Sequence, residues 1–421
     1  MKRIAMALAF VLVLPGFVRA QGQPQGDTTQ EQLRAMEERI RALETQIAEM
    51  KALLEKRVVT ETAAAAPAAP TQAPATVPAP PGAGAPSGQL PVYGGSSALG
   101  KILNPDISVI SDFLGAVGEN RIRSVPVLEM HETEVGFQAI VDPYARADVF
   151  LAFGPEGVEL EEGYLTFTSL PGGFVTKVGK MRAGFGRVNT LHNHNLPWTD
   201  RPLVTENLVG GEEGIGDAGI SVSRILPAPK DWFLEATGQV YQGNSADVFQ
   251  AQRRRDVTTV ARMRAYKDVS DSTNVDFGFS YARGSNDTGS DFHTQLYGVD
   301  ATVRWKPLRR AIYHSFIASS EFVWSRREQL PFTERAFGFF TMAEYRLSRR
   351  WTVGGRFDRS DRATNASMND SGFSALLTYW PSEFSQIRGQ YRFARYAEGR
   401  DANELRFQLL FTMGAHGAHP F

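Results

Sequence analysis

From about residue 105 to its end, the chain repeats one unit, a run of roughly ten residues in which apolar and polar side chains alternate. Successive side chains of a β-strand point to opposite faces of the sheet. A transmembrane barrel must keep this alternation, because one face of each strand meets lipid and the other lines the lumen. The pattern therefore predicts an all-β, antiparallel transmembrane barrel over residues 101–421.

Sixteen strands account for the pattern, with fourteen and eighteen as alternatives. Their expected centres lie near residues 110, 136, 149, 165, 177, 221, 236, 261, 278, 299, 319, 341, 354, 376, 391 and 409. Short breaks are expected after the even strands, and long polar breaks after odd strands at 187–216, 243–254, 283–290, 326–334 and 359–371. An even strand count places both ends of the barrel on the periplasmic side.

Three different segments precede the predicted barrel. Residues 1–20 have two basic residues, an apolar run and a small-residue end, which is typical of a secretory signal peptide too short to span a membrane. Residues 21–57 contain a heptad repeat, which predicts a coiled-coil helix. Its a and d positions are Leu33, Met36, Ile40, Leu43, Ile47, Met50 and Leu54. Residues 58–100 are rich in Pro and Ala, which predicts an extended linker without a core.

The oligomeric state is predicted from the coil. Within its heptads, the segment Arg39-Ile40-Arg41-Ala42-Leu43-Glu44 resembles a motif that favours trimers, with Arg at g and Glu at e. A generic dimeric coil is the alternative. We expect a homotrimer whose coil and linker lie in the periplasm, where the coil can contact the cell wall.

Composition narrows the classes of function. The chain has no cysteine, so it has no thiolate metal site and no cysteine nucleophile. Its formal net charge is −1, which argues against a nucleic-acid partner. No nucleophile elbow, phosphate loop or HExxH motif is present. We therefore expect neither enzymatic activity nor a cofactor.

The long break after the fifth predicted strand holds the main candidate pore residues. It combines glycines with charged residues, which suits a loop that bends back into the lumen to form a constriction, although an ordinary outer loop is the alternative. The candidates are Arg187, His192, His194, Arg201, Glu206, Glu212 and Glu213, and Trp198 and Asp200 share the same loop. The pair His192 and His194, like His416 and His419, is expected to be a polar feature, because two ligands do not complete a metal site. No metal is therefore expected.

The expected lumen wall carries nearly balanced charge. Its basic candidates are Arg146, Lys177, Arg262, Arg264, Arg304, Arg346, Arg356, Arg388, Arg392 and Arg406. Its acidic candidates are Glu134, Asp148, Glu162, Glu235, Asp276, Asp300, Glu321, Glu344 and Asp358. Arg388, Arg392 and Arg406 lie on the last two predicted strands, where they can form a basic strip for phosphate or carboxylate. Salt-bridged wall residues are the interpretation that we favour over such a strip.

The layout of signal, coil, linker and barrel resembles the phosphate-selective porin family (porins O and P) and related outer-membrane porins. The local match is segment 177–187, a glycine-rich strand that ends in Phe185-Gly186-Arg187. The resemblance implies a trimer of sixteen-stranded barrels, but no motif in this sequence carries the phosphate-binding residues of that family.

These observations predict an outer-membrane porin for passive diffusion of small hydrophilic solutes, with a slight preference for anions or phosphate. Its surroundings would be outer-membrane lipid, with the barrel in the bacterial outer membrane. A TonB-dependent receptor is excluded, because the segment before the barrel cannot fold as a plug. An envelope tether, anchored by the barrel and joined to the wall by the coil, is the alternative function.

Overall fold

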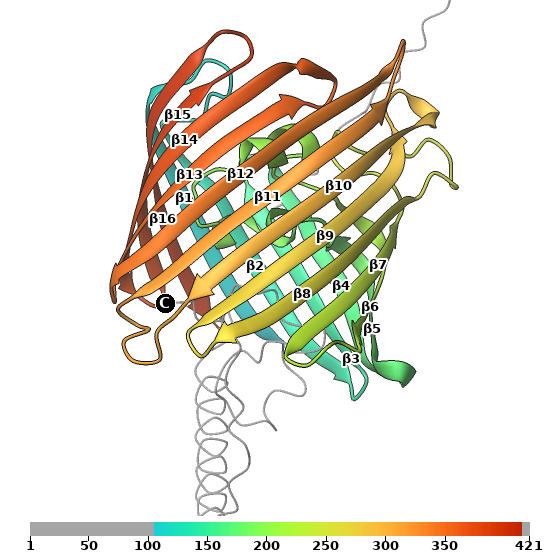
Figure 1. The fold of residues 1–421 in the computed structure, drawn as a ribbon, viewed down its shortest axis with the longest axis horizontal. Coiled ribbons are helices and arrows are strands. Elements are labelled where there is room, and N and C mark those ends of the chain that lie inside the picture. Colours follow the sequence, from blue (N-terminus) through green and yellow to red (C-terminus); the bar gives the residue numbers. More distant parts are fainter. Residues whose placement is uncertain (1–104, 415–421) are drawn as a thin grey trace, which may run out of the picture. The chain divides into compact units, whose positions relative to one another are not determined.

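The computed structural model describes residues 105–414, which form a closed antiparallel barrel (Figure 1). Each strand pairs with its neighbours in sequence, and β1 pairs with β16 to close the ring. The strands are β1 (Asp106–Glu119), β2 (Leu128–Asp142), β3 (Ala145–Gly154), β4 (Gly157–Leu170), β5 (Phe174–Arg182), β6 (Gly216–Leu226), β7 (Trp232–Tyr241), β8 (Thr258–Ser270), β9 (Thr273–Asn286), β10 (Gly289–Trp305), β11 (Ser315–Glu328), β12 (Thr333–Ser348), β13 (Trp351–Arg362), β14 (Asn365–Ser382), β15 (Ser385–Arg395) and β16 (Asp401–Gly414). The predicted count of sixteen is confirmed.

The barrel is polar inside and apolar outside, which is the arrangement that lipid requires. In β16, Leu405 and Leu409 are exposed on the outer face, whereas Arg406 and Gln408 are buried on the inner face. The same arrangement is present in β9, where Phe277 and Phe279 are exposed on the outer face and Asp276 and Ser280 are buried on the inner face. The alternation read from the sequence therefore corresponds to the two faces of the barrel wall.

Three predicted long breaks are wrong. Segment 326–334 contains only a short connection, at 329–332, between β11 and β12. Segment 283–290 is a hairpin in which β9 runs to Asn286 and β10 begins at Gly289, and segment 359–371 is a hairpin that turns at 363–364. Strand pairing uses backbone hydrogen bonds, so polar residues continue a ladder beyond the apolar belt as readily as apolar ones do. The connection after the even strand β10, at 306–314, is longer than these two odd-strand turns.

The described chain begins and ends at one rim of the barrel, because Ser108 of β1 pairs with Gly414 of β16. Among residues 105–414, no helix is long and apolar enough to cross a membrane. The predicted signal peptide, coiled coil and linker, and the histidines His416 and His419, lie outside the described residues. Those expectations stay predictions.

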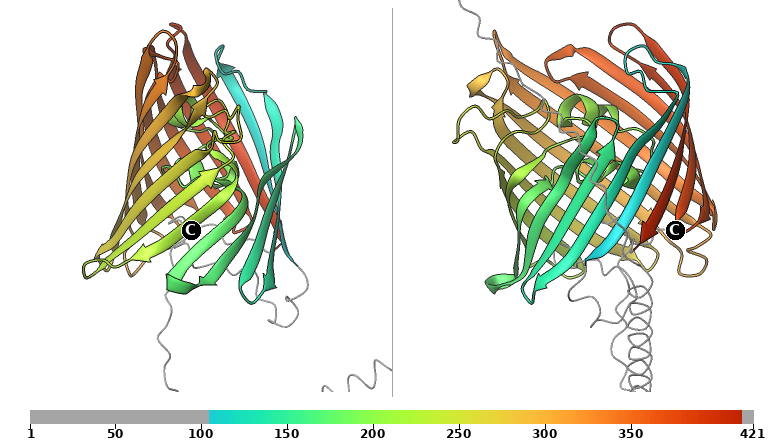
Figure 2. Two further views of the ribbon diagram at one scale, coloured as in Figure 1. Left: turned by 90° about the vertical axis from the view of Figure 1, so that its right-hand side faces the viewer. Right: turned by 180° about the vertical axis from the view of Figure 1, so that it is seen from behind.

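The connection between β5 and β6 runs through the interior of the barrel (Figures 1 and 2). This inserted loop covers residues 183–215 and contains three short helical turns. They are η2 (Val188–Thr190), η3 (Asn193–Asn195) and η4 (Thr205–Val209). Short turns of this kind leave many backbone groups without partners inside the loop. Side chains of the loop and of the wall supply those partners.

Candidate functional site in the lumen

The inserted loop begins at Phe185-Gly186, the end of the segment that resembles the porin family. Gly186 has a φ of +58°, and a Cβ at this position would lie 2.2 Å from a carboxylate oxygen of Glu321. Only glycine fits this close approach without strain. The Glu321 carboxylate accepts the backbone N–H groups of Arg187 and Val188 at 2.9 and 3.2 Å. The Arg187 side chain donates to Thr302 at 2.8 Å. The glycine thus lets the chain turn inward onto the wall.

Asn189 holds the two ends of the inserted loop together. Its Nδ2 donates to the backbone oxygens of Ala183 and Ile215 at 2.9 and 2.8 Å, and its Oδ1 accepts the N–H of Ile215 at 2.7 Å. The Asn189 side chain is buried, so no water molecule can take its place as the hydrogen-bond partner of these backbone atoms. Asn189 therefore closes the neck of the loop.

An apolar cluster fixes one side of the loop to the wall. Val188, Leu196, Val204 and Leu208 are buried from the loop side. The wall contributes inward-facing apolar residues from strands β8 to β14, namely Val260, Ala282, Leu296, Val323, Ala336, Phe340, Met342 and Leu376. The ring of Trp198 meets that of Phe340 at a centroid distance of 5.3 Å. Burial of this apolar surface stabilises the inward position of the loop.

A second contact joins the loop to the basic wall through Asp200. One of its carboxylate oxygens lies 3.0 Å from Arg356 and 3.3 Å from Arg392. Burial alone would raise the pKa of Asp200, but the two arginines hold that pKa below its ordinary value. Arg356 also pairs with Asp358 at 2.8 Å and lies 4.8 Å from the centre of the Trp198 ring. A loop carboxylate therefore neutralises part of the predicted basic strip.

The other two arginines of the strip differ in their partners. Arg406 pairs with Glu404 at 3.0 Å. Arg388 donates to the backbone oxygen of Trp198 at 3.1 Å and to Gln408 at 2.6 Å. Among the residues that the structure describes, no carboxylate lies within ion-pair distance of Arg388. Its positive charge is therefore held by neutral partners.

The remaining loop candidates divide between the interior of the loop and its surface. Arg201 is buried and donates to the backbone oxygens of Val188 and Leu191, so it holds the loop's own fold. Burial lowers the pKa of Arg201 to about 10. Burial raises the pKa of Glu206, which lies 3.5 Å from Arg123. Glu212 and Glu213 accept the Arg182 side chain through their backbone oxygens.

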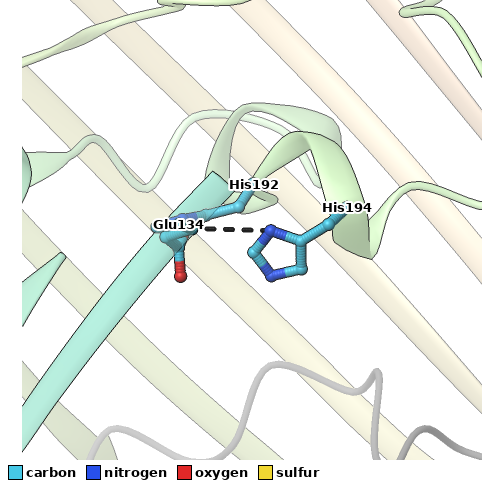
Figure 3. A group of neighbouring side chains, drawn as sticks. All are labelled: Glu134, His192 and His194. Atoms are coloured by element: carbon cyan, nitrogen blue, oxygen red, sulfur yellow. Dashed lines mark hydrogen bonds and ion pairs between the residues drawn. The ribbon is translucent and has the colours of Figure 1, made fainter. Parts of the chain in front are cut away.

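A third contact places His192 among wall carboxylates of β2 and β4. Its Nδ1 lies 2.5 Å from Glu134 and 3.2 Å from Glu161, and its Nε2 lies 2.8 Å from Glu162. Burial alone would lower the pKa of His192, but Glu134 and Glu161 raise it well above its ordinary value. His194 lies on the same side, with its Nδ1 3.7 Å from Glu134 (Figure 3). Both histidines are buried.

Sequence reasoning missed the roles of Asp200 and Glu161, and also Glu132, which accepts a hydrogen bond from the side chain of Asn193 at 3.1 Å. Asp200 was visible as a loop residue, but its arginine partners are far away in the sequence. Glu161 sits at a register shift, where Phe150 pairs with Glu162 and Leu151 pairs with Leu160. Such a bulge breaks the two-residue period, so Glu161 and Glu162 both contact the loop histidine.

Comparisons with known proteins come from sequence and from structure. No family model matches the chain. An uncharacterized protein of Aquifex aeolicus (strain VF5) is 28% identical over 398 residues, which covers 79% of this chain and 83% of that protein. The name of this similar protein states no activity.

Solved structures with the same architecture are outer-membrane proteins. The anion-selective porin from Comamonas acidovorans superimposes with a TM-score of 0.52 and 9% identity, covering 74% of this chain and 99% of that chain. The trimer form of OmpT of Vibrio cholerae superimposes with a TM-score of 0.51 and 10% identity, covering 74% of this chain and 99% of that chain. The outer-membrane channel DcaP of Acinetobacter baumannii superimposes with a TM-score of 0.50 and 11% identity, covering 76% of this chain and 100% of that chain. The chain has the fold of the outer-membrane porins.

Proposed function

We propose that this protein is an outer-membrane porin that lets small hydrophilic solutes diffuse through its lumen. The observation that carries the proposal is the charged interior of a sixteen-stranded barrel. Eight strands leave room only for side chains, whereas barrels of this size enclose an aqueous channel. The inserted loop, held to the wall at Glu321, Asp200 and His192, narrows that channel and sets the size limit for solutes.

The first test is the conductance of the purified full-length protein in a planar lipid bilayer. We expect discrete current steps, grouped in threes, since we also propose a homotrimer. The trimer form of Vibrio cholerae OmpT supports that assembly by its shared fold. A barrel that is folded, as judged by its β-sheet circular dichroism, but conducts no ions would overturn the proposal. It would favour the envelope tether, whose predicted coiled coil lies outside the described residues.

A preference for anions, phosphate among them, is a finer proposal that rests on Arg388. Its charge has no acidic partner within ion-pair distance among the described residues, and a guanidinium suits planar recognition of phosphate oxygens. The resemblance to phosphate-selective porins and the fold shared with an anion-selective porin support the same direction.

The test of this preference compares two arginine variants by their chloride current in the presence of phosphate. Arg388→Gln should lose any block by phosphate, whereas Arg406→Gln, whose partner is Glu404, should retain it. Equal block in both variants and in the unchanged protein would place the anion site elsewhere and overturn the role of Arg388.

A further inference from the structure

The contact between His192 and the wall has more ligand atoms than a simple ion pair needs. Donor atoms of Glu134, His192 and His194 all lie within 4.8 Å of one another, and so do those of Glu132, Glu134 and Glu161. Glu134 belongs to both groups. The loop brings the two histidines and the wall brings the carboxylates, so the cluster exists only when the loop is inside the barrel (Figure 3).

A neutral His192 cannot satisfy the carboxylates that face its two ring nitrogens. A neutral imidazole has one N–H and one lone pair. Here both ring nitrogens face carboxylate oxygens, Nε2 at 2.8 Å from Glu162 and Nδ1 at 2.5 Å from Glu134. The N–H can satisfy one carboxylate, but a lone pair facing the other is repulsive. Something positive must therefore lie at the Nδ1 side, either a second proton or a metal ion.

Carboxyl groups outnumber cationic side chains in this cluster. Four carboxylates meet here, those of Glu132, Glu134, Glu161 and Glu162. The cationic side chains at ion-pair distance from them are Arg182 and, when protonated, His192 and His194. Within the described chain, Glu132 Oε1 is buried without a hydrogen-bond partner, and Glu161 Oε2 is buried 3.2 Å from His192 Nδ1. Both oxygens are available as ligands.

We propose that Glu134, His192 and His194 bind a divalent transition-metal ion that fastens the inserted loop to the barrel wall. Two imidazoles and a carboxylate form a ligand set that suits zinc, with Glu161 or Glu132 available as a fourth ligand. Glu162 orients His192 through Nε2, in the way that outer carboxylates support metal-bound histidines. The edge of Phe150 against His192, at a centroid distance of 5.3 Å, keeps this side of the site apolar.

The spacing of the donors fits such an ion after small shifts. Ligand atoms of a tetrahedral zinc site lie about 3.3 Å apart. The distances from Glu134 to the Nδ1 atoms of His192 and His194 are 2.5 and 3.7 Å, one below and one above that value. The first contact has to open and the second to close by less than about 1 Å, which side-chain rotation provides. The ion would replace the proton on His192, so binding would release protons.

The test is zinc binding to the full-length protein in detergent, after removal of metals with a chelator. Because His416 and His419 could bind zinc on their own, both are changed to Ala in every sample. Calorimetry should show one zinc ion per chain. His194→Ala and Glu134→Gln should abolish this binding, and Glu162→Gln should weaken it by about tenfold or more. His293→Ala is the matched control, since its partner is Glu328 on another part of the wall.

A readout that needs no substitution in the cluster itself accompanies the titration, in case those substitutions disturb folding. Cobalt(II) bound by two imidazoles and carboxylates in a four-coordinate site gives strong visible absorption, whereas hydrated cobalt does not. We expect this absorption in the metal-free protein after one equivalent of cobalt. Absence of stoichiometric zinc binding, or unchanged affinity in His194→Ala, would overturn the proposal and leave a protonated His192 as the bridge. Both measurements are made without ion flow, so they stand whether or not the barrel conducts.

Discussion

Asp200 sets the charge that the basic wall presents to the lumen. Its carboxylate pairs with Arg356 and Arg392. Each guanidinium group has one further carboxylate partner, Asp358 for Arg356 and Glu404 for Arg392. We expect Asp200→Asn to remove the carboxylate that the two groups share, and to raise the ratio of anion to cation permeability by roughly twofold or more. The measurement is the reversal potential in a salt gradient. Asp291→Asn removes the same charge at an exposed pair with Arg253, and should leave the ratio unchanged. An equal shift in both variants would show that Asp200 acts only through net charge.

At the residue scale, the sequence predicted which side chains line the lumen but not how they pair. The two-residue period placed Arg356 and Asp358 on the inner face without knowledge of the loop. Which carboxylate compensates Arg392 depends on the path of the loop, which no local pattern encodes. The convergence of carboxylates on His192 depends on the bulge at Glu161, and a bulge has no signature in alternating polarity.

The inserted loop acts as one element because its two ends are closed by Asn189. We expect Asn189→Ala to destabilise the closed neck by about 1–3 kcal/mol, because the buried N–H of Ile215 is left without a partner. The oxygens of Ala183 and Ile215 each keep a backbone hydrogen bond. The loop should then move within the lumen. Single-channel recordings should show greater current noise or larger steps, and added protease should cut the loop faster. These effects follow from three lost hydrogen bonds.

The matched control for this prediction is Asn195→Ala, an exposed asparagine on the same loop. It should keep the current noise and the protease resistance of the unchanged protein. If both variants behave alike, the neck is held by the apolar cluster and by the wall contacts, and Asn189 contributes little. The sequence predicted the length and the inward tendency of this loop. It could not show the role of Asn189, because the partners of that side chain are backbone atoms at both ends of the loop.

For the whole molecule, the faces of the strands followed from the two-residue period, because lipid requires every strand to alternate. The strand number followed from that period together with the breaks between strands, with fourteen and eighteen as alternatives. Hairpins such as β9–β10 were mispredicted as breaks, because strands extend past the lipid as far as backbone pairing continues. Each strand therefore has two parts. The part within the apolar belt alternates strictly between apolar and polar residues, and the polar ends beyond the belt do not. The loop length could be read from the sequence, but the boundary between belt and extension could not.

The contrast between the apolar belt and the polar extensions predicts where the outer face of the barrel tolerates a charged side chain. Phe279 lies on the outer face near the middle of β9 and is exposed to lipid. Phe279→Arg should lower the free energy of unfolding by about 2–4 kcal/mol, because an arginine at mid-depth loses its hydration. Phe332→Arg, in the connection between β11 and β12, should change it little, although Phe332 is also exposed. Denaturant unfolding of each variant in lipid vesicles, followed by tryptophan fluorescence, measures both values. Equal losses would mean that β9 does not face hydrocarbon, and the inside-out assignment of the barrel would then fail at this strand.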